Sequence, residues 1–133
     1  MQPKVGAIAV VRHAGRFLLV KRRKEPHAQT WGFPGGQVEL GETATEAAVR
    51  ELAEETGVKG KAERYLTNID VIARDGSGEV RFHYLLAVVI CSYQSGVPKA
   101  ADDVSDAGWY TPAQAATLDQ SPNVQDIFDL MDT

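Results

Sequence analysis

The segment 50–55, Arg-Glu-Leu-Ala-Glu-Glu, carries the side chains with the clearest capacity for chemistry. In a helix, at roughly 100° per residue, Glu51, Glu54 and Glu55 fall within an arc of about 100° on one side. A carboxylate cluster of this kind suits a hard divalent cation, which seeks oxygen ligands. A solvated charged face is the alternative, because Glu is a good helix former and is common on surfaces.

The sequence also marks where this helix begins and ends. Thr43 and Glu46 have the spacing of a capping box, and Gly57 is placed to end the helix. The glutamates therefore lie near the negative end of the macrodipole, where cations are preferred, at a cost of about 0.3–1 kcal/mol for each carboxylate. Like charges three or four residues apart cost roughly 0.2–0.5 kcal/mol more for each pair. A bound cation would offset this cost.

A glycine-rich stretch precedes the helix. The residues Phe33-Pro34-Gly35-Gly36 bring the backbone beside the carboxylates, where the Gly36 carbonyl is able to join them around Mg2+, with Mn2+ as a substitute. Mg2+ commonly bridges protein carboxylates to substrate phosphates. The combination therefore predicts phosphate chemistry.

The fixed positions of the segment 36–58 resemble the signature of the Nudix hydrolases. Gly36 and five residues precede Glu42, and seven residues then precede the run Arg50-Glu51-Leu52-x-Glu54-Glu55-x-Gly57-Val58. The resemblance implies an α/β (α+β) fold, a Nudix-type α/β/α sandwich with a mixed, partly antiparallel sheet between helices. It also implies a Mg2+-dependent pyrophosphohydrolase that cleaves the phosphoanhydride of a nucleoside diphosphate derivative, either an ADP-ribose-like compound or an (oxidised) nucleoside triphosphate. The alternative is a catalytically silent nucleotide-binding sensor of the same fold.

The resemblance assigns roles to individual residues. Either Glu51 or Glu54 is expected to act as general base, and Arg50 is expected to orient Glu54, its alternative role being a surface ion pair. One more acid for the metal is expected from the loop 92–105, where Asp103 is the nearer match and turn chemistry is the alternative. The expected metal ligands are Gly36, Glu51, Glu54, Glu55 and Asp103.

Two further features are candidates for substrate contact. The basic run 21–24 stands where a strand enters the loop before the glycines, so Arg22 and Arg23 are predicted to meet a phosphate, with a solvated surface as the alternative. Trp31 is predicted to stack on a base, and its alternative role is that of a packed core aromatic. Substrate identity is not encoded in any motif of the loops 25–31 and 92–105.

Strands and helices around the signature follow from periodicity and turn residues. The segments 5–11 and 17–20 read as a hairpin, 37–40 as a short extended piece, and 64–74 with 79–92 as a long hairpin. A short strand is expected at 109–110. Thr-Pro and Ser-Pro pairs predict helices at 112–117 and 122–131.

Composition bounds the remaining possibilities. A chain of 133 residues with 44% apolar content is expected to form a single domain, 1–133. No apolar run reaches a membrane span, no secretory layout opens the chain, and Cys91 is the only cysteine, so a cytoplasmic protein without membrane partners is expected. A net charge of −4 argues against a nucleic acid polymer and leaves a small-molecule nucleotide as the expected partner. The resemblance also allows a homodimer.

Overall fold

β1 (Lys4–His13) is the strand from which the fold extends in this computed structural model, which describes residues 2–132. Side chains of a strand alternate between two faces. Ala7, Ala9 and Val11 are buried on the face that packs on α1 (Ala44–Thr56), whereas Val10 belongs to a second core on the opposite face. Burial on both faces explains why this strand is an almost continuous apolar run.

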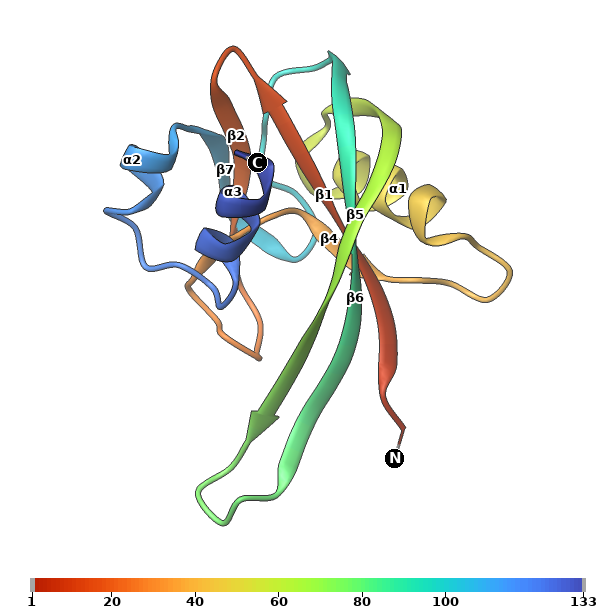
Figure 1. Cartoon of the computed structure of the whole chain (residues 1–133), viewed down its shortest axis with the longest axis vertical. Coiled ribbons are helices and arrows are strands. Elements are labelled where there is room, and N and C mark those ends of the chain that lie inside the picture. Colours follow the sequence, from red (N-terminus) through yellow and green to blue (C-terminus); the bar gives the residue numbers. More distant parts are fainter. Residues whose placement is uncertain (1, 133) are drawn as a thin grey trace.

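The other strands pair with β1 directly or through its neighbours to give one mixed sheet (Figure 1). The order is β3-β2-β1-β6-β5, with β4 paired to β1 and β7 paired to β2. β1 and β6 run parallel, with Ala7 opposite Ala87, and the other pairs are antiparallel. The strand bounds are Arg16–Arg22 for β2, Trp31–Gly32 for β3, Gly35–Gln37 for β4, Lys59–Arg74 for β5, Val80–Ser95 for β6 and Val104–Tyr110 for β7.

Helices cover both faces, which confirms the predicted mixed sheet between helices (Figure 1). α1 packs through Ala47, Ala48 and Leu52 on one face. On the other face Ile127 and Phe128 of the last helix join the second core. Within residues 2–132, none of the helices combines the length and the hydropathy that a membrane crossing requires. The remaining helix bounds are Pro112–Ala115 for α2 and Val124–Met131 for α3.

The ends of α1 follow the local hydrogen bonds that the sequence predicts. The Thr43 hydroxyl accepts from the Glu46 backbone N–H at 3.2 Å, and the Glu46 carboxylate accepts from the Thr43 backbone N–H at 2.9 Å. Gly57 ends the helix with φ 73°, in the left-handed region that glycine adopts without strain. The predicted helix is thus confirmed at both ends, and its carboxylates are fixed in orientation relative to the sheet.

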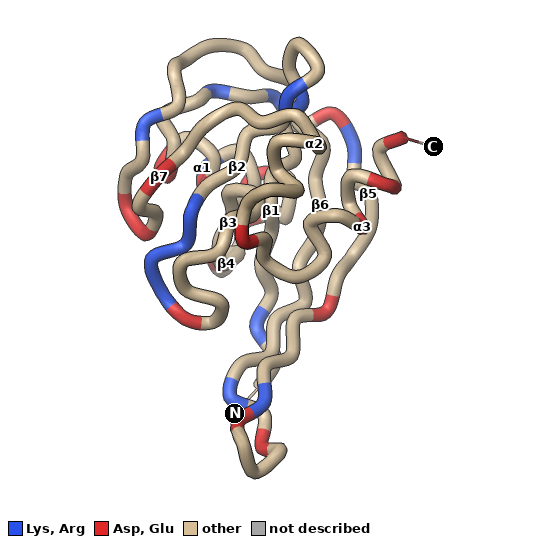
Figure 2. The backbone as a smooth tube through the Cα atoms, turned by 90° about the vertical axis from the view of Figure 1, so that its left-hand side faces the viewer, with Lys and Arg blue, Asp and Glu red and all other residues tan. Residues whose placement is uncertain are grey.

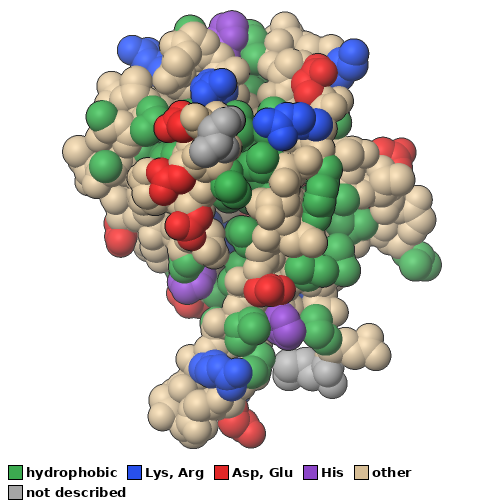
Figure 3. Space-filling view, in the orientation of Figure 1, with side chains coloured by type: hydrophobic (Ala, Val, Ile, Leu, Met, Phe, Trp, Pro, Cys, Tyr) green, Lys and Arg blue, Asp and Glu red, His purple; other side chains and the backbone are tan. Residues whose placement is uncertain are grey.

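The long hairpin is confirmed and extends further than expected. β5 and β6 reach Lys59 and Ser95, which pair with each other, so the loop expected at 92–105 shrinks to 96–103. The far ends of both strands project from the rest of the fold (Figure 1). Hydrophobic and charged side chains mix on the part of this projection that faces the viewer in Figure 3. Ile72, for example, is 47% exposed.

The remaining elements differ from expectation at their ends. The extended piece expected at 37–40 is β4, displaced toward the glycines, and the strand expected at 109–110 begins already at Val104 because it pairs with β2 along most of its length. α2 is capped by Thr111 as expected but is short. α3 begins at Val124 because Asn123 has φ 74° and cannot continue a helix.

Leu52 offers a test of how far the fold depends on contact between α1 and the sheet. Leu52→Ala removes a side chain with no exposed surface, so we expect a loss of about 2–5 kcal/mol in the free energy of unfolding, measured by urea denaturation. Leu40→Ala makes the same chemical change at a fully exposed position and should change that free energy by less than about 0.5 kcal/mol. Equal losses in the two variants would contradict this description of the core.

Candidate functional site

The Arg50 guanidinium is the centre of the polar network on α1. It makes five hydrogen bonds, which matches the five N–H groups of the side chain. Nε and Nη2 hold the two oxygens of Glu42 at 2.7 and 2.9 Å, and Nη1 reaches Glu51 at 2.7 Å and Glu54 at 3.2 Å. Nη2 also donates to the backbone carbonyl of Gln37 at 3.0 Å. One cation therefore links the helix, the loop before it and β4.

This network explains how the acids of α1 are tolerated. The bidentate contact with Arg50 lowers the pKa of Glu42 to about 2, and the same carboxylates hold the pKa of Arg50 above its ordinary value. Arg50 donates to Glu54, the residue that it was predicted to orient, but it binds Glu42 and Glu51 at shorter distances. The cost of crowding carboxylates at the helix end is therefore partly offset within the protein.

Three carboxylates remain close enough together to share a cation. One oxygen each of Glu51, Glu54 and Asp102 lies within 4.8 Å of the others. Carboxylate oxygens from two elements, with one guanidinium beside them, fit the preference of Mg2+ for oxygen ligands. Asp102 has φ 57°, in the left-handed region that Asp adopts more readily than most residue types.

The loop acid in this cluster differs from the expected one. Asp103 was the nearer match to the family pattern, but its carboxylate forms an ion pair with Lys24 at 2.9 Å. Asp102 contributes to the carboxylate cluster instead. The one-residue difference arises from the left-handed turn at Asp102, which spacing along the chain does not reveal.

Gly36 permits the close approach of Glu51 to β4. A Cβ atom at residue 36 would lie 2.5 Å from the carboxyl carbon of Glu51 and 2.7 Å from both of its oxygens. Such distances are far below van der Waals contact, so any larger residue would displace the carboxylate. The close approach of Glu51 therefore gives a steric reason for glycine at the first position of the signature. The carbonyl ligation predicted for Gly36 is a separate role.

Glu55 is the most buried acid of the helix. Its side chain is 6% exposed and accepts a hydrogen bond from the Gly35 backbone N–H at 3.0 Å. Burial raises its pKa to about 8, against the opposite effect of the Gly35 hydrogen bond. Burial likewise raises the pKa of Glu51, although Arg50 opposes it. Both acids therefore hold a proton to higher pH than exposed glutamates do.

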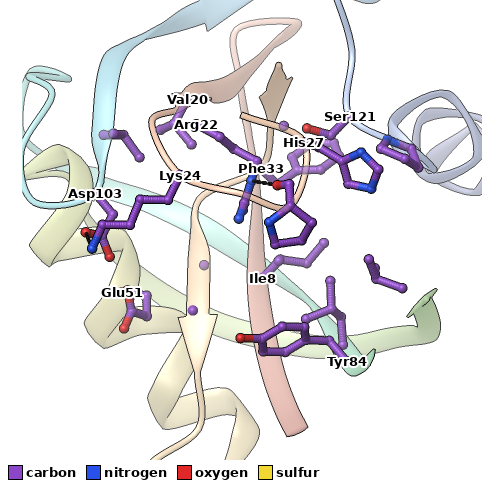
Figure 4. A pocket seen from close by; sticks show the side chains of 18 of the residues that line it. Ile8, Val20, Arg22, Lys24, His27, Phe33, Glu51, Tyr84, Asp103 and Ser121 are labelled. Carbon is purple, nitrogen blue, oxygen red and sulfur yellow. Dashed lines mark hydrogen bonds and ion pairs between the residues drawn. The ribbon is translucent and has the colours of Figure 1, made fainter. Parts of the chain in front are cut away.

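A cavity of about 390 Å³ adjoins these acids. Glu51 and Glu55 line it on the helix side, and Figure 4 shows Glu51, Asp103 and Lys24 on one side of the space and Tyr84 and His27 on others. Apolar side chains of β1, β2, β5, β6 and α3 form much of the remaining wall, and the loop 24–27, Gln37 and Ser121 add polar groups to it. A concave site with charged groups on one side and an apolar wall on the other is typical of small-molecule binding sites.

The expected substrate contacts divide between this cavity and other places. Arg22 lines the cavity, where its Nε donates to the Pro26 carbonyl at 2.9 Å. Arg23 does not line it and instead donates to the Val104 carbonyl at 3.3 Å. Trp31 is also absent from the wall, because it is 8% exposed and packs against Tyr110 with ring centroids 5.2 Å apart. Trp31 therefore occupies the position of a packed core aromatic, which is its alternative role.

Other cavity residues were not singled out from the sequence. Lys24 belongs to the same basic run as Arg22, which Figure 2 shows as a continuous blue stretch leading from β2 into the following loop. Tyr84 and His27 line the cavity from β6 and from that loop. The sequence predicts a strand at 79–92, but which face of that strand borders a cavity depends on tertiary packing. Asp102 lies next to Asp103 in the sequence, and no motif distinguishes the two.

Comparison with known proteins places this geometry in a family. The family model described as NUDIX domain matches residues 1–131. An ADP-ribose pyrophosphatase of Methanocaldococcus jannaschii is 34% identical over 110 residues, which cover 83% of this chain and 63% of that protein. Phosphatase NudJ of Escherichia coli is 35% identical over 94 residues, covering 70% of this chain and 61% of that protein. The matched part thus spans less than two thirds of these curated relatives.

Solved structures share the fold over nearly the whole chain. A MutT NUDIX hydrolase from Burkholderia pseudomallei superposes with a TM-score of 0.82 at 29% identity, covering 98% of each chain. The NUDIX domain of Shewanella oneidensis NrtR, solved in complex with ADP ribose, superposes with a TM-score of 0.79 at 21% identity, covering 99% of this chain and 88% of that one. At the latter identity the likeness shows the fold alone.

Gly36→Ala tests the steric reason for the glycine. The new methyl group displaces the Glu51 carboxylate, so we expect affinity for Mg2+, measured by isothermal titration calorimetry, to fall by roughly tenfold or more. Gly76→Ala is the matched control, because the hairpin turn has open space at that position. Unchanged Mg2+ affinity in a folded Gly36→Ala variant would show that the position of Glu51 is irrelevant to the metal.

Glu55 gives the metal-free protein a distinctive pH dependence. Its pKa rises from 4.5 to about 8 on folding, so between these values the folded chain retains a proton that the unfolded chain has released. The stability contributed by this group is therefore fully present below about pH 4.5 and is lost as the pH rises through about 8. We expect Glu55→Gln to flatten the decline in unfolding free energy between pH 5 and 8, measured by urea denaturation with chelator present. A variant with the same slope as the parent chain would refute the assignment.

Proposed function

Because this chain belongs to the NUDIX domain family, we propose that it is a Mg2+-dependent pyrophosphohydrolase of nucleoside diphosphate derivatives. The observation that supports this most strongly is the carboxylate cluster of Glu51, Glu54 and Asp102 at the edge of a cavity. Carboxylates that share a cation commonly face a phosphate, and the cavity has room for the rest of a nucleotide. The proposal takes the whole of 1–133 as one domain.

Basic groups on the cavity wall suit an anionic substrate. Arg22 uses Nε for the Pro26 carbonyl, and within residues 2–132 its two Nη groups make no hydrogen bond. Lys24 is paired with Asp103 but is 69% exposed, so its ammonium group is free to turn toward a phosphate. Both residues are offered as diphosphate contacts. Arg23 and Trp31 are offered only as supports of the surrounding loop and core.

The metal set proposed for this site is Glu51, Glu54, Glu55, Asp102 and the Gly36 carbonyl. Mg2+ bound there would neutralise charge on the diphosphate and acidify a water molecule, and Mn2+ could supply the same chemistry. Asp103, named from the family pattern, is retained as the partner of Lys24. The donor set is all oxygen, as these two cations prefer.

Between the two candidates for general base, Glu51 is favoured. It lines the cavity, whereas Glu54 does not, and burial raises its pKa toward the range in which a carboxylate accepts protons effectively. Glu51 would take a proton from the attacking water, whose oxygen forms a bond to phosphorus as the bridging P–O bond breaks. Arg50 would hold Glu51 and Glu54 in orientation throughout. The products are a nucleoside monophosphate and the phosphorylated remainder.

ADP-ribose is the first substrate to test. The Methanocaldococcus jannaschii relative is named for hydrolysis of that compound, and the NrtR domain was solved with it bound. Other relatives carry names that specify no such substrate, so nucleoside triphosphates belong in the same panel. The alternative is a sensor that binds nucleotide without turnover. Appearance of nucleoside monophosphate on addition of Mg2+ separates the two functions.

Substitution of the two glutamates tests the mechanism. We expect Glu51→Gln to lower kcat by about 10²-fold or more on ADP-ribose, with no recovery at high Mg2+, because the proton acceptor is gone. Glu54→Gln should also lower kcat but recover in part at raised Mg2+, because its main loss is metal affinity. Chromatographic detection of AMP gives both rates, and Glu79→Gln at the hairpin turn is the control. Wild-type activity in Glu51→Gln would remove it as the base.

A further inference from the structure

Asp102 reaches the carboxylate cluster from an exposed turn at residues 101–104. The turn is closed by a hydrogen bond from the Val104 N–H to the Ala101 carbonyl at 3.3 Å, with Asp102 and Asp103 between them. Ala101, Asp102 and Asp103 are all exposed, so burial of their side chains does not hold them in place. The direction of the Asp102 carboxylate therefore depends on the contacts that hold the backbone of the turn.

On one side, the loop that leads into the turn is fixed to the end of α1. The backbone N–H of Lys99 donates to the Thr56 carbonyl at 2.9 Å. That of Ala101 donates to the Glu55 carbonyl at 2.9 Å. The last carbonyls of a helix have no partner within the helix, so these contacts satisfy two of them. The start of the turn is thus tied to the helix that carries the other acids of the cluster.

On the other side, the turn enters an irregular part of β7. Lys21 of β2 lies opposite Asp106, whereas Arg22 lies opposite Val104, so β7 has one residue more than β2 at this point. A bulge of this kind disrupts the regular ladder of hydrogen bonds and changes the direction of nearby side chains. The end of the turn therefore needs support from contacts outside the regular ladder.

Arg23 supplies this support with two hydrogen bonds. Its backbone N–H donates to the Asp103 carbonyl at 3.2 Å, and its Nη2 donates to the Val104 carbonyl at 3.3 Å. The ion pair between Lys24 and Asp103 joins the same two segments, but both side chains are exposed, and such pairs contribute little. Arg23 does not line the cavity, so its guanidinium is placed to hold the turn and not to touch a bound nucleotide.

We propose that Arg23 is a positioning residue of the metal site, which holds the bulge and the turn so that the Asp102 carboxylate meets those of Glu51 and Glu54. This inference rests on the proposed function and adds to it a residue that acts from outside the cavity. The turn is held between the end of α1 and the end of β2, and Arg23 is the side chain that fixes the second of these contacts. A metal ligand on an exposed turn is thereby oriented before the cation arrives.

Charge alone predicts the opposite effect for the loss of Arg23. A positive side chain near a group of acids repels a divalent cation, so its removal should raise the affinity for Mg2+. If Arg23 orients Asp102, its removal should instead lower that affinity, because the turn must then be ordered at the moment of binding. The direction of the change therefore separates the two effects.

Calorimetric titration of the full chain with Mg2+ alone tests the inference. We expect Arg23→Ala to weaken Mg2+ binding by roughly threefold to tenfold. In a chain that already carries Asp102→Ala, the same substitution should weaken binding by less than about twofold, because the ligand that Arg23 positions is absent. A general effect on the fold would weaken binding equally in both backgrounds.

Arg16→Ala is the matched control. It removes the same side chain from an exposed position at the opposite end of β2. The charge there is separated from the cluster by more than the distance over which salt screens exposed charges, so Mg2+ affinity should stay within about twofold of the parent value.

Hydrogen exchange of the chain in the presence of chelator gives a second readout that needs neither metal nor turnover. The amides of Ala101 and Val104 donate hydrogen bonds that hold the turn. We expect both to exchange at least about threefold faster in Arg23→Ala, because local opening governs their protection. The amide of Leu52, in the middle of α1, should exchange at the parent rate.

Several results would overturn the inference. Unchanged or tighter Mg2+ binding by Arg23→Ala, equal losses with and without Asp102, or unchanged exchange at Ala101 and Val104 would each do so. Absence of Mg2+ binding by the parent chain would overturn it together with the metal site. Failure of the parent chain to hydrolyse any nucleotide, with the dependence of Arg23 on Asp102 intact, would refute the hydrolase function and leave the role of Arg23 standing.

Discussion

The hydrogen bonds of Arg50 are the interaction on which the site depends. The last turns of α1 bring three carboxylates to one side of a helix whose own dipole disfavours them, and no basic residue lies in its last turn. One guanidinium, 23% exposed, binds Glu42 bidentately and holds Glu51 and Glu54 with its remaining donors. Because the Glu42 and Glu51 side chains are only 16% and 13% exposed, their pairs with Arg50 are less screened by water than exposed ion pairs are. Glu51 and Glu54 each use one carboxylate oxygen for Arg50, so the other oxygen of each is available for a cation.

Small residues at the helix–sheet contact make this arrangement possible. Ala7 and Ala9 of β1 face Ala47 and Ala48 of α1, so the helix lies close to the sheet. Gly36 has no side chain at the point where β4 approaches Glu51, and any side chain there would collide with the Glu51 carboxylate. Close packing of the helix therefore serves the site as much as the core, since it sets the distance between the carboxylates and the backbone of β4.

Interactions between residues close together in the sequence were sufficient to predict some parts of this structure but not others. The capping box of Thr43 and Glu46 and the end of α1 at Gly57 are determined by contacts within a few residues, and both were predicted. Which basic residue faces the cavity was not predictable, because a register shift between Lys21 and Arg22 alters the alternation along β2. The burial of Trp31 has the same origin in tertiary packing, whereas the place of Asp102 in the carboxylate cluster follows from its left-handed backbone conformation. A sequence motif specifies residue types and their spacing. The direction of a side chain at the end of a strand depends instead on the strands and loops packed beside it.

The parallel pairing of β1 with β6 has a consequence for how the chain reaches its folded state. Residues 4–11 lie beside residues 84–91, so the centre of the sheet cannot form until nearly all the intervening chain has been gathered. The β5–β6 hairpin and α1 depend on nearer neighbours and can form earlier. Folding dominated by such distant contacts is slow compared with that of helical proteins of similar size. During synthesis, the edge of β1 that pairs with β6 must therefore remain without its partner strand until residues 84–91 have been made.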